Sequence, residues 1–143
     1  MPVEITVCAE PSEAERNIIL QGLVAYNRLQ AGETRVEPVA VMLRDSETGI
    51  MLGGLWGRIS YDWLFVELLF VPEAARGADL GTALLAKAEE VARERGCVGI
   101  RLDTYSFQAP DFYRKQGYEV FGVLDDHPVG AQRIFFSKRL REG

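Results

Sequence analysis

The chain contains, at residues 64–85, the sequence LFVELLFVPEAARGADLGTALL, which does most to decide the fold. Residues 64–71 form an almost continuous apolar run that ends at Pro72, as expected for a central strand covered on both faces of its sheet. A helix is predicted over residues 80–94, because its apolar residues recur on one stripe and its charged residues face outward. A buried strand that enters a helix through a short glycine-containing turn is typical of α/β proteins.

The turn itself, residues 76–82, reads Arg-Gly-Ala-Asp-Leu-Gly-Thr and is suited to binding an anion. Gly77 and Gly81 let the backbone turn tightly, and the helix N-terminus adds about half a positive charge. Arg76 and the Thr82 hydroxyl can supply further donors. A triphosphate-binding loop would need a lysine, and a dinucleotide fingerprint would need a third glycine at the right spacing. The pyrophosphate of coenzyme A fits best, although a strand-to-helix turn without a ligand could have the same pattern.

The segments on either side predict a mixed α/β domain. Ser12 and Glu15 form a capping box at the start of a helix that ends at residues 31–32. Glycines inside the strand expected at residues 50–60 indicate a bulge or a close approach by another backbone. The other expected strands are residues 3–8, 38–44, 98–104, 118–124 and 133–140, and a short helix runs from residue 110 to residue 117. No linker interrupts this order, so we expect a single domain over residues 1–143.

Composition narrows the classes of partner. The 143 residues include 16 basic and 21 acidic side chains, and the formal net charge is −5. This balance argues against a nucleic-acid partner, which needs a basic surface, and favours a small cationic ligand such as an amine. No apolar run approaches the roughly 18 residues that span a bilayer, and the N-terminus lacks a signal-peptide pattern. We therefore expect no membrane partner and a cytoplasmic location.

Two cysteines and one histidine leave little scope for a metal site. Cys8 and Cys97 are far apart and have no companion ligand at metal-binding spacing, so we expect both to be small core residues. His127 is the only histidine. We expect no bound metal.

A second motif, SFQAPDFYRKQGY at residues 106–118, narrows the interpretation of the first. Together the two motifs resemble those of the GNAT superfamily of acetyl-coenzyme A-dependent N-acetyltransferases. The family pattern Ala-x-x-aromatic-Tyr-x-x-x-Gly-aromatic matches Ala109, Phe112, Tyr113, Gly117 and Tyr118 in full. The family's other pattern, Arg or Gln, two residues, Gly, one residue, Gly or Ala, matches Arg76 and Gly81 but has Asp79 in place of its first glycine. The resemblance implies a GNAT fold, with a central mixed, mostly antiparallel sheet flanked by helices.

The resemblance also implies where acetyl-coenzyme A binds, namely between the diverging ends of the strands at residues 64–71 and 98–104. The main chain of Leu69, Phe70 and Val71 would bind the pantetheine arm. The pyrophosphate would be held by Arg76, Gly77, Ala78, Asp79, Leu80, Gly81 and Thr82. The expected coenzyme site is completed by Ser106, where the family often has asparagine, and by Ala109 and Tyr113.

Two side chains are the expected catalytic groups. By the resemblance, Tyr113 is the general acid, since a phenol with an ordinary pKa near ~10 is protonated at neutral pH. Glu67, in an otherwise apolar strand, is the candidate general base that takes a proton from the incoming ammonium, directly or through a water. Tyr113 could instead be a core tyrosine, and Glu67 could instead orient the substrate or form a structural ion pair. Asp125, Asp126 and His127 are alternative groups in a loop near the expected acceptor site.

The sequence thus predicts an enzyme that transfers an acetyl group from acetyl-coenzyme A directly to a primary amine of a small molecule or peptide. The alternative is a non-catalytic coenzyme A-binding or interaction module with the same fold. The fold is compatible with a homodimer. Asp79 is expected to tolerate a left-handed conformation and to cap the helix that follows it.

Overall fold

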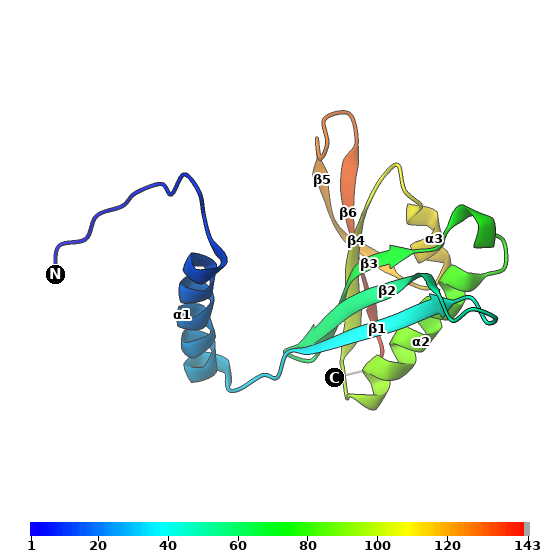
Figure 1. Cartoon of the computed structure of the whole chain (residues 1–143), viewed down its shortest axis with the longest axis horizontal. Coiled ribbons are helices and arrows are strands. Elements are labelled where there is room, and N and C mark those ends of the chain that lie inside the picture. The colour runs from blue at the N-terminus through cyan, green and yellow to red at the C-terminus, as the bar shows by residue number, and fades with distance from the viewer. Residues whose placement is uncertain (142–143) are drawn as a thin grey trace. The chain divides into compact units, whose positions relative to one another are not determined.

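The computed structural model describes residues 1–141, which form two compact units (Figure 1). The first unit is Met1–Thr34, and the second begins at Arg35.

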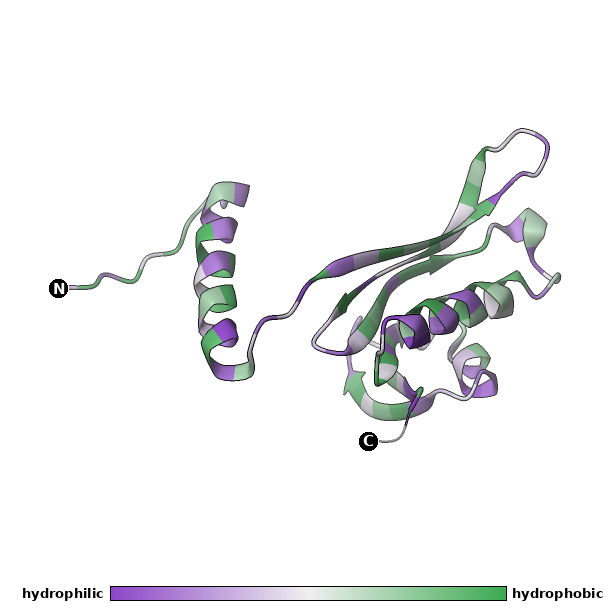
Figure 2. Ribbon diagram, turned by 90° about the horizontal axis from the view of Figure 1, so that it is seen from below, coloured by the Kyte–Doolittle hydropathy of each residue, from purple (hydrophilic) through white to green (hydrophobic). Residues whose placement is uncertain are grey.

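The first unit contains one helix, α1 (Glu13–Ala31). Its predicted capping box is confirmed: the Ser12 hydroxyl accepts a hydrogen bond from the N–H of Glu15, and the Glu15 carboxylate accepts one from the N–H of Ser12 at 3.0 Å. The helix ends at Gly32, whose φ of 82° suits glycine. Apolar and polar residues alternate along α1 (Figure 2), and none of its residues is buried within this unit.

Two predictions for the first unit are wrong. Residues 3–8 do not form a strand, and Cys8 is exposed rather than part of a core. A strand needs a neighbouring strand to satisfy its N–H and C=O groups, and residues 1–34 contain no other strand. The same unit has no buried cluster that could enclose the Cys8 thiol, which lies 3.5 Å from a carboxylate oxygen of Glu15.

The second unit is built on a six-stranded sheet in the order β1-β2-β3-β4-β6-β5. Its elements are β1 (Glu37–Arg44), β2 (Met51–Ser60), β3 (Trp63–Phe70), α2 (Leu80–Glu94), β4 (Gly99–Tyr105), α3 (Pro110–Lys115), β5 (Glu119–Asp125) and β6 (Gln132–Arg139), with a single 3₁₀ turn at Glu73–Ala75. All neighbouring strands are antiparallel except β3 and β4, which are parallel. The expected mixed, mostly antiparallel sheet is therefore confirmed.

The core of this unit lies between one face of the sheet and the helices α2 and α3. Leu64 and Val66 of β3 are buried under α2, together with Leu85 and Phe136. The expectation that the β3 run is covered on both faces is wrong within this unit, because Leu68 is 67% exposed. The described residues from Arg35 onward place both α2 and α3 against the same face, so no element of this unit covers the other.

A β-bulge interrupts the pairing of β2 with β3, as the glycines of β2 led us to expect. Trp56 pairs with Leu68 and Gly57 pairs with Val66, so Glu67 is the extra residue. Glycine is required at position 57, because a Cβ there would overlap the backbone carbonyl oxygen of Phe65. The bulge bends β3 at Glu67.

Candidate functional site

The strands β3 and β4 pair only over part of their length. Their parallel ladder runs from the Trp63–Gly99 pair to the Val66–Leu102 pair. Beyond it β3 stays paired with β2 as far as Phe70, while β4 stays paired with β6 as far as Tyr105. The two strands therefore diverge after the bulge at Glu67 (Figure 1), and the backbone edges that face each other carry unpaired N–H and C=O groups.

A groove of about 1140 Å³ occupies this opening. Its walls come from the diverging strands, the start of α2, and α3 with the loop before it. Most of the predicted site residues line it, namely Glu67, Leu69, Phe70, Val71, Arg76, Gly77, Asp79, Leu80, Gly81, Thr82, Ala109 and Tyr113. Ala78 and Ser106 are not among the lining residues. The Ser106 hydroxyl accepts a hydrogen bond from the N–H of Gln132 at 2.9 Å, which ties the end of β4 to the start of β6.

One end of the groove is the N-terminus of α2. Asp79 is the N-cap residue, and its φ of 55° and ψ of 30° confirm the predicted left-handed conformation. The prediction that its side chain caps the helix is wrong, because its carboxylate makes no capping hydrogen bond. A capping side chain usually projects from a residue with extended backbone. The left-handed backbone of Asp79 points its side chain in a different direction.

This end of the groove fits an anion. The first three N–H groups of a helix have no intrahelical acceptor, and in α2 these belong to Leu80, Gly81 and Thr82. No acidic residue lies in the first turn of α2. The Thr82 hydroxyl accepts a hydrogen bond from the Gln116 side-chain amide at 3.1 Å, so its own proton remains available to donate. Among the described residues that line this end of the groove, Asp79 carries the carboxylate that opposes an anion.

Tyr113 lies on α3 with its ring in the core. The ring contacts those of Phe112, Tyr118 and Phe136, with centroids 5.1 to 6.2 Å apart. Burial raises the pKa of Tyr113 above the ordinary tyrosine value. The phenol therefore keeps its proton at neutral and mildly alkaline pH. Its hydroxyl makes no hydrogen bond to any of residues 1–141, although the residue lines the groove, so this proton is available to a bound molecule.

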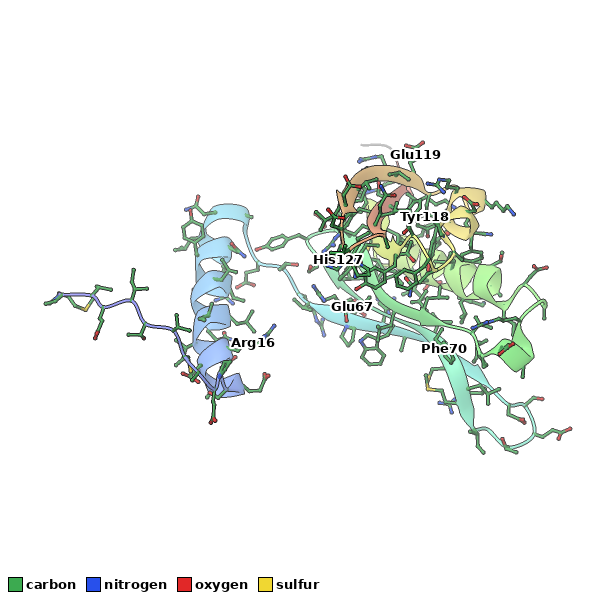
Figure 3. The ribbon with its side chains drawn as sticks, turned by 90° about the horizontal axis from the view of Figure 1, so that it is seen from above. Arg16, Glu67, Phe70, Tyr118, Glu119 and His127 are labelled. Carbon is green, nitrogen blue, oxygen red and sulfur yellow. The ribbon has the colours of Figure 1, made fainter. Side chains whose placement is uncertain are left out.

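Glu67 is the bulged residue of β3, and its carboxylate forms an ion pair with Arg58 of β2. The guanidinium of Arg58 lies over the Phe65 ring, 5.0 Å from its centroid. The Glu67 side chain remains 30% exposed. Figure 3 shows Glu67 and Phe70 on the same strand, and both line the groove. The carboxylate is thus held beside the groove by a cation that balances its charge.

Sequence reasoning missed a second acid and its partner. Asp103 of β4 pairs with Arg133 of β6, and both line the groove. It also missed Gln108, whose side-chain oxygen accepts hydrogen bonds from the Thr104 hydroxyl at 2.8 Å and the Tyr105 N–H at 2.9 Å. No sequence motif marks these residues, because the contacts depend on how β4 aligns with β6 and on the turn after β4.

Comparisons with known proteins agree on one family. The model of the Acetyltransferase (GNAT) family matches residues 10–118. The chain is 40% identical to the blasticidin-S acetyltransferase of Streptomyces morookaense over 119 residues, which are 82% of this chain and 88% of that one. It is 39% identical to an acetyltransferase of Agrobacterium fabrum (strain C58 / ATCC 33970) over 128 residues, 90% of this chain and 92% of that one.

The chain belongs to the GNAT acetyltransferase family. A crystal structure of an acetyltransferase from Agrobacterium tumefaciens agrees, with a TM-score of 0.89 at 34% identity, and the match covers 96% of this chain and 99% of that one. This protein is accordingly an acetyl-coenzyme A-dependent acetyltransferase, which favours the enzyme over the non-catalytic module.

Residues 1–141 of this acetyltransferase show neither a cluster of metal ligands nor a helix suited to a membrane. No group of three or more histidine, cysteine, aspartate or glutamate side chains there could hold a metal ion. Among the same residues, none of the helices combines the length and the apolar character needed to cross a bilayer.

Proposed function

We propose that this acetyltransferase transfers the acetyl group of acetyl-coenzyme A directly to a primary amine of a small molecule or peptide, in the groove between β3 and β4. The observation that carries the proposal is the divergence of these strands after Glu67, which opens a groove from the α2 N-terminus to the Glu67 carboxylate. Both expected catalytic side chains, Tyr113 and Glu67, line it. When bound, acetyl-coenzyme A supplies an acetyl group activated as a thioester.

The residues that would hold the donor fit its chemistry. The main chain of Leu69, Phe70 and Val71 lies at the β3 edge that β4 leaves unpaired, where an amide-containing arm such as pantetheine can reach it. The Val71 carbonyl oxygen already accepts a hydrogen bond from Nε of Arg76 at 3.2 Å, and its second lone pair is left for a ligand. An N–H group at this edge can also donate to a carbonyl oxygen on which negative charge develops. The α2 N-terminus, with Arg76 and Thr82 beside it, offers donors to a pyrophosphate.

Tyr113 is the proposed general acid. Its phenol is protonated at neutral pH, since burial raises its pKa, and the hydroxyl has no protein acceptor among residues 1–141. The proton is therefore held at an oxygen beside the groove, where a departing thiolate can take it.

Glu67 is the proposed group that receives the proton of the incoming amine. An alkylamine is mostly ammonium at pH 7 and cannot attack a carbonyl carbon until it has lost a proton. The partly exposed Glu67 carboxylate can attract this ammonium and accept its proton, directly or through a water. Arg58 keeps the carboxylate on the groove side of β3 and limits the space it can sample.

The acceptor is proposed to be a small molecule. The Streptomyces morookaense relative is named for blasticidin-S, which makes that compound the first acceptor to test.

The two free cysteines are consistent with a reducing compartment such as the cytoplasm. The family model spans parts of both units, so we propose that they belong to one domain.

The test is free-thiol release from acetyl-coenzyme A over a panel of amines, including blasticidin S, with acetylated products identified by mass spectrometry. We expect release that depends on an amine and yields an equal amount of N-acetylated product. Thiol release that no amine accelerates, with coenzyme A still bound, would show that the acceptor is not an amine.

A further inference from the structure

Three aromatic rings stack at the carboxyl end of β4. The Phe107 ring lies parallel to that of Tyr105, with centroids 5.1 Å apart and an interplanar angle of 6°. The His127 ring, from the loop between β5 and β6 (Figure 3), stacks on Tyr105 at 5.5 Å. Although the Phe107 ring stacks on Tyr105, Phe107 remains 65% exposed. Much of an aromatic surface is thus left open, and Phe107 and Tyr105 both line the groove.

The stack is held in place by polar contacts. The Arg133 guanidinium lies 4.5 Å from the Tyr105 ring centroid and is fixed by its ion pair with Asp103. The N–H of Tyr105 donates to the Gln108 side chain at 2.9 Å. These contacts hold Tyr105 in one position before any ligand arrives, and the Phe107 ring stacks on Tyr105. A ligand that stacks on Phe107 would therefore lose little free energy in ordering these rings.

The opposite wall of the groove is also apolar. Leu68 and Phe70 of β3 are 67% and 57% exposed, and both line the groove. Glu67 and Asp103 also line the groove, each ion-paired with an arginine, and the Glu67 side chain is the more exposed of the two, at 30% against 12%. A ligand that matches this end would present a flat unsaturated face to Phe107 and an ammonium to the partly exposed Glu67 carboxylate, which can accept further hydrogen bonds beside that of Arg58.

We propose that the acceptor is an amine that carries a planar aromatic or heteroaromatic group, and that this group stacks on the open face of Phe107 while its ammonium lies near Glu67. This inference rests on the proposed function and names the substrate class of the same site. A flat ring gains from stacking on an aromatic face, whereas a saturated ring of the same size gains only from burial. Phe107 and Tyr105 are therefore specificity-determining residues.

The test compares phenethylamine with cyclohexylethylamine, which have the same charge and linker and nearly the same size. With the wild-type enzyme, we expect kcat/KM to be about threefold to tenfold higher for phenethylamine, through a lower KM. Phe107→Leu should abolish this preference, because it should lower kcat/KM for phenethylamine more than for cyclohexylethylamine. Phe121→Leu is the matched control, because Phe121 is exposed to 61% but does not line the groove. It should leave the preference intact.

A second measurement needs no turnover. Calorimetric titration of phenethylamine into the wild-type enzyme and into Phe107→Leu, each saturated with coenzyme A, should show weaker binding to the variant by a similar factor. Titration of coenzyme A alone should give equal affinities for the two proteins.

Several outcomes would overturn this inference. If the wild-type enzyme acetylates both amines equally, the stacking claim fails while the proposed function stands. If Phe107→Leu weakens coenzyme A binding, the open ring serves the donor, whose adenine is also planar. If neither amine nor any other on the panel is acetylated and phenethylamine does not bind, the proposed function fails with it.

Discussion

At Tyr113, the ring is fixed among three aromatic neighbours while its hydroxyl has no acceptor among residues 1–141. Tyr113→Phe should therefore leave the fold intact and lower kcat by about one to three orders of magnitude, or about 1.4–4 kcal/mol of transition-state stabilisation. Since burial raises the pKa of Tyr113, any loss of wild-type activity from its ionisation should begin above pH ~10. Single-turnover thiol release, measured across alkaline pH, checks both expectations. An unchanged rate in Tyr113→Phe would exclude the general-acid role.

The Glu67 carboxylate is expected to matter for the acceptor and not for the donor. Glu67→Gln keeps the shape of the side chain and should shift or remove the acidic limb of the pH–rate profile, while calorimetry shows an almost unchanged affinity for coenzyme A. Asp103→Asn is a useful control, because it removes the other ion-paired carboxylate that lines the groove. If only Asp103→Asn alters the acidic limb, the proton acceptor has been assigned to the wrong carboxylate.

The candidate site could be predicted from sequence only where a residue type and its spacing carry the information. The left-handed Asp79 follows from the backbone that a tight turn demands, and Tyr113 follows from a motif. A structural ion pair of Glu67 was one of the alternatives that the sequence left open, and the structure contains it. Its partner, Arg58, could not be predicted, because the bulge that makes Glu67 the extra residue of β3 changes which residues of β2 lie beside it. The bulge itself was expected from the glycines, but not where it falls on β3.

Among the elements, the N-terminus of α2 combines anion-binding N–H groups with the carboxylate of Asp79, which makes no capping hydrogen bond. Asp79→Asn retains tolerance of the left-handed conformation and removes the charge, so coenzyme A should bind about twofold to fivefold more tightly. The gain should shrink at high salt, because exposed charges are screened. Isothermal titration at two ionic strengths measures it, with Glu73→Gln as a control for an exposed acid that does not line the groove. Equal affinities for Asp79→Asn and the wild type would mean that the carboxylate points away from the pyrophosphate.

A buried polar cluster joins α2 to the end of the sheet. Glu89 of α2 accepts hydrogen bonds from the Tyr118 hydroxyl at 3.1 Å and from Lys138 at 2.9 Å. Burial and the neighbouring Glu89 carboxylate raise the pKa of Tyr118 above its ordinary value. As the pH rises past ~10 the unfolded chain loses this proton before the folded protein does, so the free energy of unfolding falls.

Tyr118→Phe should lower the free energy of unfolding by about 1–3 kcal/mol at pH 7, because it removes the hydroxyl donor from a buried carboxylate. The alkaline decline should become shallower but remain, since burial also raises the pKa of Tyr113 and Cys97. Urea unfolding between pH 7 and pH 11 measures both effects. Tyr26→Phe is the control, because Tyr26 is 61% exposed. If the two variants unfold alike at every pH, the Glu89 cluster contributes no measurable stability.

The predictions of whole helices and strands were confirmed where the pattern of apolar residues in the segment matches the surface against which the segment packs. The helix predicted over residues 80–94 is α2 (Leu80–Glu94), and its apolar stripe packs against the sheet. Residues 3–8 have the alternation of a strand, yet pairing is a property of two segments and the first unit offers no second one. Coverage of a sheet face likewise depends on a second element. The apolar run of β3 alone could therefore not predict whether both of its faces are covered.

In the molecule as a whole, the divergence of β3 from β4 opens the groove in which we propose that this acetyltransferase binds acetyl-coenzyme A. Most predicted site residues, from positions as distant as Glu67 and Tyr113, line this one opening. The ladder between the two strands stops at the Val66–Leu102 pair, immediately before the bulged Glu67. Catalysis would thus depend on a local break in the regular sheet.

A crystal structure of the protein with bound coenzyme A tests this proposal. We predict that the pantetheine arm lies between β3 and β4, with hydrogen bonds to the main chain of residues 69–71. The pyrophosphate should contact the N–H groups at residues 80–82, and the thiol should lie within reach of the Tyr113 hydroxyl. Coenzyme A bound outside this groove, or a thiol far from Tyr113, would contradict the account.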